Sequence, residues 1–431
     1  MIAEVVSIGD EITSGQRLDT NSQWLSQQLG ECGIRAAYHT TVGDDLAANV
    51  RVFREAIQRA DIVISTGGLG PTADDLTREA LAETTGRPLR LDSTALSQIR
   101  ALFTRRKREM PERNAVQAMF PETSRVIPNL NGTAPGIDLS VARPDRSPSR
   151  IFALPGVPAE MREMWKHSVA PAIAEMLGPS RHVIRHHCIK CFGVGESELE
   201  RMLPDMIRRG RIPTVGITAS KATLTLRVSA EAASDEAFHT LCAPTVKTIR
   251  ELLGSLIFSE DDREELQHVV VRLLAQQHKS LATVEFGSGG LLSQWLTDAD
   301  TNGRVYRGGI VLPTGTAVLS NPNQVPAATT NLRRTYFPPG TNEASATGEY
   351  AETARSLLDA DYALVIGSFP QSDSADQKPG NVYLGLASPH GCKVHCHPFA
   401  GHPELLRERT LKLALNALRL ELESADIAPP R

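Results

Sequence analysis

The sequence predicts an α/β protein with more than one domain, and three observations lead to this fold class. Its 431 residues exceed what one hydrophobic core usually organises. In the N-terminal third, short apolar runs typical of buried strands alternate with amphipathic helical stretches. Several of these runs end in turns rich in glycine or acidic residues. Strands that alternate with helices predict a parallel sheet covered on both faces, which makes three layers.

The N-terminal elements follow in order from the apolar pattern. Asp61–Gly68 is the clearest strand, because an apolar run leads directly into a glycine-rich turn. The polar segment Ala142–Arg150 is interpreted as a hairpin or loop inside the domain. The expected strands are Ala3–Gly9, Ile34–Asp44, Asp61–Gly68 and Arg150–Pro158, and the expected helices are Ser22–Gly33, Leu46–Ala60 and one from Ala159.

Two further domains are expected after the first. We place the N-terminal domain at residues 1–178, because the segment Leu177–Arg181 is typical of a boundary. A small α+β domain is expected at residues 182–256. A third, α/β domain is expected at residues 260–425, with a long closing helix from His402.

Composition excludes several classes of protein. The formal net charge is −4, so no general positive field favours nucleic acid or an anionic membrane. No apolar stretch approaches the roughly 20 residues that span a bilayer, and MIAEVVSIGDE is unlike a secretion signal. Six cysteines are too few for a disulfide scaffold. We therefore expect a cytoplasmic protein with neither nucleic acid nor membrane as a partner.

Two cysteine clusters offer possible metal ligands. Cys188 and Cys191 form a CxxC, but the segment is typical of a strand, whose alternation puts them on opposite faces. The segment Gly391–Phe399 offers two cysteines and two histidines as soft ligands. Because no second half-site occurs at a recognised spacing, we predict no structural zinc.

The segment STGGLGPTADDLT (Ser65–Thr77) is the most informative about function. A strand ends, three glycines allow a tight turn with exposed N–H groups, and a helix is expected from Thr72 or just after. Backbone donors and the positive end of a helix make a site for phosphate. Asp74 and Asp75 would then stand in the first helical turn, where they could hold a divalent metal. Equally, Thr72 and Asp75 fit a T-x-x-D capping box that needs no ligand.

Two more acidic pairs follow predicted strands. Asp44 and Asp45 precede the helix expected near Leu46, and either could serve as its N-cap. Asp10 and Glu11 follow the first strand. Ligands of a parallel sheet bind beyond the carboxyl ends of its strands, so these acids are expected at one rim. Such a rim would repel a polyphosphate unless metal ions neutralise it, which favours a metal-dependent diphosphate reaction.

Two Gly/Pro turns and one polar segment complete the predicted rim. The turns lie in Asn131–Leu139 and Ala153–Met161, and ordinary turn chemistry is the alternative explanation for both. Arg105–Glu122 is basic and then acidic, which is typical of a solvated helix face. Its side chains that could still reach a ligand are Arg113, Asn114 and Gln117.

These motifs resemble the CinA (competence/damage-inducible protein A) family. The matching segments occur in the family's order: SIGDEITSGQ, DTNSQWL, TTVGDD, DIVISTGGLGPTADDLT, REMPERNAVQAMFPE, NGTAPG and IFALPGVPAEMREM. The N-terminal region is also similar to the molybdopterin-binding fold of molybdenum-cofactor biosynthesis proteins, whose glycine turn ends in an aspartate matching Asp75. The middle region, with FGVGESELE, resembles the family's KH-like domain, although no clear GxxG loop in a basic setting predicts RNA binding.

The resemblance implies hydrolysis of ADP-ribose to AMP and ribose 5-phosphate, with a divalent metal (Mg, Mn or Co) and in some members potassium. It also implies a homodimer. We expect Asp44 and Asp75 to be catalytic, without deciding which activates water, and Asp10, Glu11 and Asp74 to bind the metal. The residues expected to bind phosphate or nucleotide are Gly9, Gly67, Gly68, Gly70, Thr72, Asn114, Gly132, Thr133, Pro155 and Gly156.

The C-terminal region resembles the family's nicotinamide-nucleotide amidase domain but departs from its motifs. The family's A-E-S-C-T-G-G is here Val284–Gly290, and Phe286, which has no hydroxyl, holds the serine position. G-G-V-V-A-Y-S-N-x-x-K is replaced by Gly308–Ser320, without the tyrosine and lysine, and T-G-I-A-G-P-x-G becomes Ile366–Asp373. We predict a domain that keeps its scaffold and has lost catalysis, unless Ser288 replaces the missing serine.

Two other functions stay open on the sequence. The N-terminal rim also fits a nucleotide- or pterin-binding module without turnover. The C-terminal domain also fits a residual nicotinamide mononucleotide deamidase.

Overall fold

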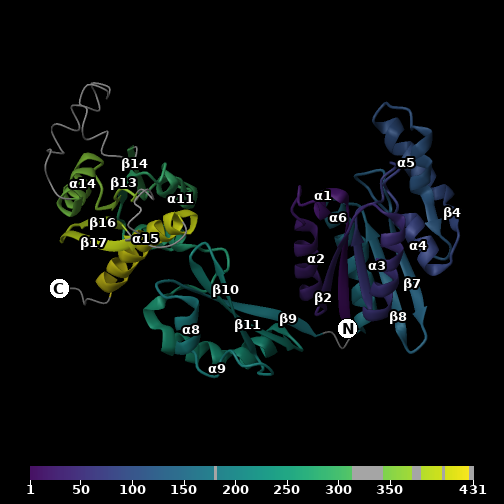
Figure 1. Cartoon of the computed structure of the whole chain (residues 1–431), viewed down its shortest axis with the longest axis horizontal. Helices are drawn as coiled ribbons and strands as arrows, with labels where there is room; N and C mark the ends of the chain where they lie inside the picture. The colour runs from purple at the N-terminus through teal and green to yellow at the C-terminus, as the bar shows by residue number, and fades with distance from the viewer. Residues whose placement is uncertain (179–181, 313–342, 371–379, 400–402, 427–431) are drawn as a thin grey trace. The chain divides into compact units, whose positions relative to one another are not determined.

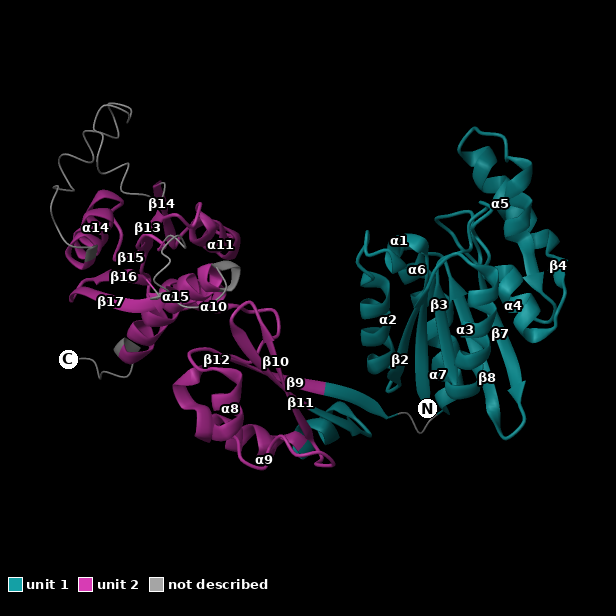
Figure 2. Ribbon diagram, in the orientation of Figure 1, with its two compact units in different colours: residues 1–185, 229–241 teal, residues 186–228, 242–431 magenta. Residues whose placement is uncertain are grey.

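The computed structural model of the chain is drawn in Figure 1 and describes residues 1–178, 182–312, 343–370, 380–399 and 403–426. The chain forms two compact units, shown in different colours in Figure 2: residues 1–185 with 229–241, and residues 186–228 with 242–431. Helices and sheets mix throughout, which confirms the predicted α/β class. The three predicted domain ranges stay predictions. Part of the proposed boundary, residues 179–181, lies outside the described residues.

A six-stranded sheet forms the centre of the first unit. Its strands are β1 (Ile2–Ile8), β2 (Arg35–Val42), β3 (Ile62–Thr66), β6 (Arg125–Ile127), β7 (Gly136–Arg143) and β8 (Arg146–Leu154). The order is β2-β1-β3-β8-β7-β6, in which β2, β1, β3 and β8 are parallel and β7 and β6 antiparallel. The segment expected to be a hairpin or loop is a hairpin that pairs Arg143 with Arg146, and it makes the sheet mixed.

Helices cover both faces of this sheet, as predicted. They are α2 (Thr20–Glu31), α6 (Pro158–Met164) and α7 (Ala170–Leu177) on one face, and α3 (Leu46–Arg59), α4 (Thr77–Thr85) and α5 (Ser93–Arg105) on the other. Alternate residues of β1 enter the two cores: Val6 packs with Phe53 of α3, and Val5 packs with Leu25 of α2. A strand buried on both faces reads as a continuous apolar run, which explains the sequence of β1.

The loops that follow the parallel strands meet at one edge of the sheet. β1 leads into the short helix α1 (Asp10–Thr13), and β2 leads into Gly43 and Asp44. Asp45 is the N-cap of α3, because its Oδ1 accepts a hydrogen bond from the Ala48 amide at 2.7 Å. The helix therefore begins at Leu46 as predicted, and Asp44 is left without a capping role.

The middle region contains a four-stranded sheet of order β10-β11-β9-β12 and two helices, in agreement with the α+β prediction. Its elements are β9 (Val183–Cys191), α8 (Glu196–Met202), β10 (Thr214–Ser220), β11 (Thr223–Ala232), α9 (Asp235–Leu253) and β12 (Ile257–Ser259). Cys188 and Cys191 lie in β9, as expected, and both are buried. Burial raises the pKa of each thiol to about 12, so neither is a reactive thiolate at neutral pH.

The C-terminal region has a five-stranded sheet of order β14-β13-β15-β16-β17, in which β13 pairs in parallel with β14 and β15. Its elements are α10 (Leu266–Gln276), β13 (Leu281–Phe286), α11 (Leu291–Ala299), β14 (Tyr306–Leu312), α14 (Glu343–Leu357), β15 (Tyr362–Ile366), β16 (Gly380–Ser388), β17 (Gly391–Phe399) and α15 (Pro403–Asp426). The predicted long closing helix is α15, although His402 lies outside the described residues. Among the helices that are described, none is long and apolar enough to cross a membrane.

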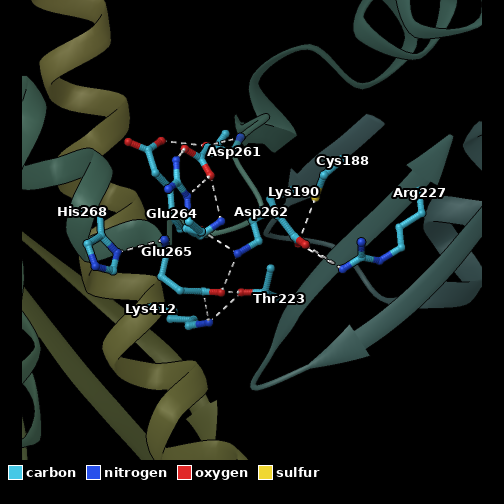
Figure 3. Close-up of polar contacts among 12 residues, drawn as sticks. Cys188, Lys190, Thr223, Arg227, Asp261, Asp262, Glu264, Glu265, His268 and Lys412 are labelled. Atoms are coloured by element: carbon cyan, nitrogen blue, oxygen red, sulfur yellow. Dashed lines mark hydrogen bonds and ion pairs between the residues drawn. The ribbon is translucent and has the colours of Figure 1, made fainter. Parts of the chain in front are cut away.

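A buried cluster of charges joins β9, α10 and α15 in the second unit (Figure 3). Glu265 accepts from the ammonium of Lys190 at 2.9 Å and from that of Lys412 at 2.7 Å, and Thr223 donates to it at 3.0 Å. Burial would raise the pKa of Glu265, but the two lysines hold it below its usual range. Glu265 also forms a capping box with His268, so the same carboxylate starts α10.

The N-cap assignment gives a test within one pair of neighbouring aspartates. Asp45→Ala removes the cap of α3 and is expected to lower the free energy of unfolding by about 1 kcal/mol. Asp44→Ala is expected to lower it by less than Asp45→Ala does, because Asp44 does not cap α3 and accepts one exposed hydrogen bond from the Asp10 amide. Urea unfolding followed by tryptophan fluorescence in a Trp295→Phe background reports on Trp24 and Trp165, both in the first unit. Equal losses for the two variants would contradict the assignment.

Candidate functional site

A cleft of about 520 Å³ opens at the carboxyl edge of the N-terminal sheet. The loops after β1, β2, β3 and β8 contribute to its walls, because parallel strands deliver their carboxyl ends to the same edge. The predicted site residues that line it are Gly9, Glu11, Asp44, Gly67, Gly68, Gly70, Asp74, Asp75, Thr133, Pro155 and Gly156. Four strand-end loops and the loop carrying Thr133 thus converge on one cavity.

Two predicted residues bond to the lining without being part of it. The amide of Asp10 donates to Oδ2 of Asp44 at 2.9 Å, and the amide of Asp44 donates to Oδ1 of Asp10 at 3.1 Å. This reciprocal pair ties the loop after β1 to the loop after β2. Thr72 donates to Asp75 through both its amide and its hydroxyl.

Two other predicted ligands, Asn114 and Gly132, also lie outside the lining. Asn114 is buried, and its Nδ2 donates to Oε1 of Gln117 at 2.9 Å. Gln117 lines the cleft and donates to the carbonyl of Leu69 at 3.4 Å, so Asn114 orients a lining residue. The amide of Gly132 donates to Oδ1 of Asn129 at 2.8 Å within its own loop.

The turn after β3 requires glycine at two positions. Gly67 and Gly68 have φ angles of 107° and 62°, which side chains other than hydrogen disfavour. A Cβ at Gly67 would collide with the carbonyl oxygen of Ile8, and one at Gly68 would collide with the hydroxyl of Thr77. Within the described part of the chain, the amides of Gly68 and Leu69 have no acceptor. These two donors are therefore available to an anion in the cleft.

The structure corrects the position of Asp75. α4 begins at Thr77, so the prediction of a helix from Thr72, with Asp74 and Asp75 in its first turn, is wrong. The carboxylate of Asp75 instead accepts from the amide of Gly70 at 2.7 Å and from the amide and hydroxyl of Thr72. The donors of Gly70 and Thr72 thus occupy the Asp75 carboxylate, which is therefore not the N-cap of α4. Thr72 and Asp75 thus close a turn, and Asp75 fixes the shape of the glycine turn.

The acids of the rim repel one another. Burial raises the pKa of Asp44, and the neighbouring charges of Asp10, Asp74 and Glu11 raise it further against the effect of the Asp10 amide. Asp74 differs, because a hydrogen bond from Thr72 lowers the pKa of this exposed carboxyl. Within the described residues, no three His, Cys, Asp or Glu side chains are grouped to hold a metal by themselves. The rim is therefore a negative surface and not a preformed metal cage.

Several lining residues were not singled out from the sequence, among them Arg17, Asp19, Asn21 and Glu160. Asp19 caps α2 by accepting from the Ser22 amide, a spacing that an N-cap search would have found. Nδ2 of Asn21 donates to the Gly156 carbonyl at 2.9 Å, although the two residues are far apart in the chain. No local pattern signals such a contact.

The C-terminal residues that replace the family's serine motif form a buried hydrogen-bond network at the start of α11. Glu285 is fully buried and accepts from the Ser288 hydroxyl at 2.6 Å and from the amides of Leu292 and Ser293 at 3.0 and 2.8 Å. Ser288 is itself 4% exposed, so it orders the start of α11. The ring of Phe286 packs against Tyr350, with centroids 4.9 Å apart. Of the other two altered motifs, residues 313–320 and 371–373 lie outside the described residues.

The cysteines and histidines of β17 divide between its two faces. Cys392 and Cys396 share one face by strand alternation, whereas His395 and His397 share the other, with ring centroids 6.3 Å apart. The four side chains cannot surround one tetrahedral ion. The pKa of His397 is lowered mainly by burial and to a smaller extent by the nearby charges of His395 and Arg409.

Comparison with known proteins gives matches along the chain. Residues 4–175 match the family described as "Probable molybdopterin binding domain", residues 186–259 the "Damage-inducible protein CinA KH domain", and residues 263–422 the "CinA C-terminal domain".

Relatives match the chain over different lengths. A competence-damage inducible protein of Symbiobacterium thermophilum is 40% identical over 313 residues, covering 72% of each chain. One of Acetivibrio thermocellus is 33% identical over 421 residues, covering 97% of this chain and 98% of its own. The solved structure of protein CinA from Thermoplasma acidophilum is 34% identical, covering 40% of this chain and 99% of its own, with a TM-score of 0.37. The chain therefore belongs to the CinA family, as its motifs indicated.

Proposed function

We propose that the N-terminal domain hydrolyses the diphosphate bond of ADP-ribose, giving AMP and ribose 5-phosphate with the help of a divalent metal. The observation that carries this proposal is the cleft in which the glycine turn and the acidic rim face one space. The turn offers the amides of Gly68 and Leu69 to a phosphate oxygen. The acids offer hard oxygen ligands to a cation that the same phosphates would share.

The donor set fits a magnesium-type ion, although it does not enclose one. Mg²⁺ commonly binds through one or two carboxylates, several waters and the phosphates of its substrate. Glu11 and Asp74 line the cleft and would hold the ion together with the diphosphate. When bound, it would polarise a phosphoryl oxygen and neutralise developing charge. The same oxygen ligands accept manganese or cobalt.

The two catalytic candidates have different roles in this proposal. Asp44 lines the cleft and its pKa is raised, so it is the candidate to take a proton from the attacking water. Asp75 already accepts three hydrogen bonds from the turn, so it holds the turn in shape. For the C-terminal domain we propose no amidase activity, because Phe286 replaces the serine and Ser288 is bonded to Glu285.

Product analysis with ADP-ribose tests the proposal directly. The full-length protein is expected to release AMP with at least one of magnesium, manganese or cobalt. Asp44→Asn is expected to lower kcat by about 10²- to 10⁴-fold with KM within a few-fold, because it removes a general base but not a phosphate contact. Asp45→Asn is the matched control, since Asp45 caps α3 and does not line the cleft.

Each outcome of this assay is informative. No AMP with any of the three metals would contradict the proposal, and ligand binding without turnover would then favour a binding module. Nicotinamide mononucleotide is offered in parallel and is expected to release no ammonia. Ammonia release that Ser288→Ala abolishes would contradict the loss of the amidase.

The repulsion among the rim acids predicts a dependence of stability on pH and metal. Because the folded pKa of Asp44 is raised, the folded chain holds this proton more tightly, and the resulting stability is lost as pH rises through that pKa. At neutral pH, a divalent ion at ten times its Kd is expected to raise the Tm of the N-terminal transition by ~3–5 °C. Asp44→Asn should reduce both effects. Calorimetry that finds a Tm independent of magnesium, manganese and cobalt would count against the metal site.

A further inference from the structure

Arg78 on α4 is a buried cation that pairs with no acidic side chain among the residues that the structure describes. Its side chain is 1% exposed, and its Nε has no hydrogen-bond partner. Nη2 donates to the carbonyl of Leu69 at 2.7 Å, and Nη1 donates to the carbonyl of Gly70 at 3.3 Å. Burial lowers the pKa of Arg78 to about 10, and the more distant Glu79 and Asp75 offset this only in part.

Other buried guanidinium groups of this chain are compensated differently. Arg419 is also 1% exposed and donates to two backbone carbonyls, but it pairs with Glu423 at 3.0 Å. Arg143, whose side chain is 4% exposed, pairs with Asp61 at 2.7 Å. A buried charge without a partner of opposite charge destabilises a fold. Because Arg78 differs from Arg419 and Arg143 in this respect, we expect its counter-ion to be an anion outside the protein.

The place of Arg78 indicates where this anion would lie. Its two acceptors, Leu69 and Gly70, belong to the glycine turn that lines the cleft. Arg78 donates to both carbonyls and thereby places a positive charge against the turn, although Arg78 itself does not line the cleft. Apart from Arg17, the charged side chains that line the cleft are acidic. The two sides of the cleft therefore differ in charge: acidic side chains lie on the rim, and a cation lies beneath the glycine turn.

We propose that Arg78 is the positioning residue of a phosphate subsite on the Gly67–Gly70 turn, and that a phosphate group of the substrate is its missing counter-ion. The inference rests on the proposed function and specifies it, because it assigns the diphosphate to the turn and the cation to the acids of the rim. Arg78 acts through the turn and touches no reacting atom. A guanidinium is required because its fork donates to both carbonyls at once, which an ammonium cannot do in the same geometry.

The test compares Arg78→Lys and Arg78→Gln with Arg419→Gln in the full-length protein. Calorimetric titration with inorganic pyrophosphate in excess magnesium measures the subsite without requiring turnover. Arg78→Gln is expected to weaken pyrophosphate binding by about 10- to 100-fold, because the positive charge behind the turn is lost together with the contacts that hold the turn. Arg78→Lys keeps the charge and should weaken binding less. Arg419→Gln, the matched buried arginine, should bind like the wild type.

Steady-state hydrolysis of ADP-ribose by the same variants separates this inference from the proposed function. A rise in KM that follows the loss of pyrophosphate affinity supports both. Unchanged pyrophosphate binding in folded Arg78 variants, beside an active wild type, overturns the subsite and leaves the function standing. Weakened binding in Arg78→Gln beside an inactive wild type overturns only the hydrolase. Equal weakening in Arg419→Gln would mean that Arg78 acts merely through the fold. If Arg78→Gln does not fold, Arg78→Lys decides by the same criteria.

Discussion

The glycine turn after β3 is held from both sides, and the candidate site depends on this restraint. Asp75 binds the amides of Gly70 and Thr72 from one side, while Arg78 binds the carbonyls of Leu69 and Gly70 from the other. These contacts occupy the amides of Gly70 and Thr72 and the carbonyls of Leu69 and Gly70, whereas the amides of Gly68 and Leu69 have no acceptor within the described residues. Preorganised dipoles of this kind need no rearrangement when charge arrives.

Much of the fold could be predicted because its elements are locally specified. The strand before Gly67 is apolar on both faces, and α3 begins at Leu46 because Asp45 supplies its cap. The start of α4 could not be predicted in this way. Thr72 and Asp75 fit a helix cap in sequence, but the nearby amide of Gly70 competes for the same carboxylate and delays the helix to Thr77. These hydrogen bonds are local in the chain, but their competition with a helix cap is not visible in the sequence pattern.

The candidate site shows the same division between local and distant information. Topology alone indicated that acids after β1 and β2 would meet, and the reciprocal bonds of Asp10 and Asp44 now describe that meeting. Neither the bond from Asn21 to Gly156 nor the burial of Arg78 leaves a periodic signal, because each depends on segments that only the fold brings together. The hydrogen bonds from Gly70 and Thr72 to Asp75 likewise have no signal in the sequence pattern.

The proposed site holds a diphosphate between the glycine turn and the acidic rim of the N-terminal domain. The most direct measurement is a crystal structure of the full-length protein with a methylene-bridged ADP-ribose analogue and manganese, located by its anomalous signal. We expect phosphate oxygens on the amides of Gly68 and Leu69, and manganese between the analogue and the carboxylates of Glu11 and Asp74. An analogue bound elsewhere, or one whose phosphates avoid the turn while manganese avoids the rim, would contradict the proposed site.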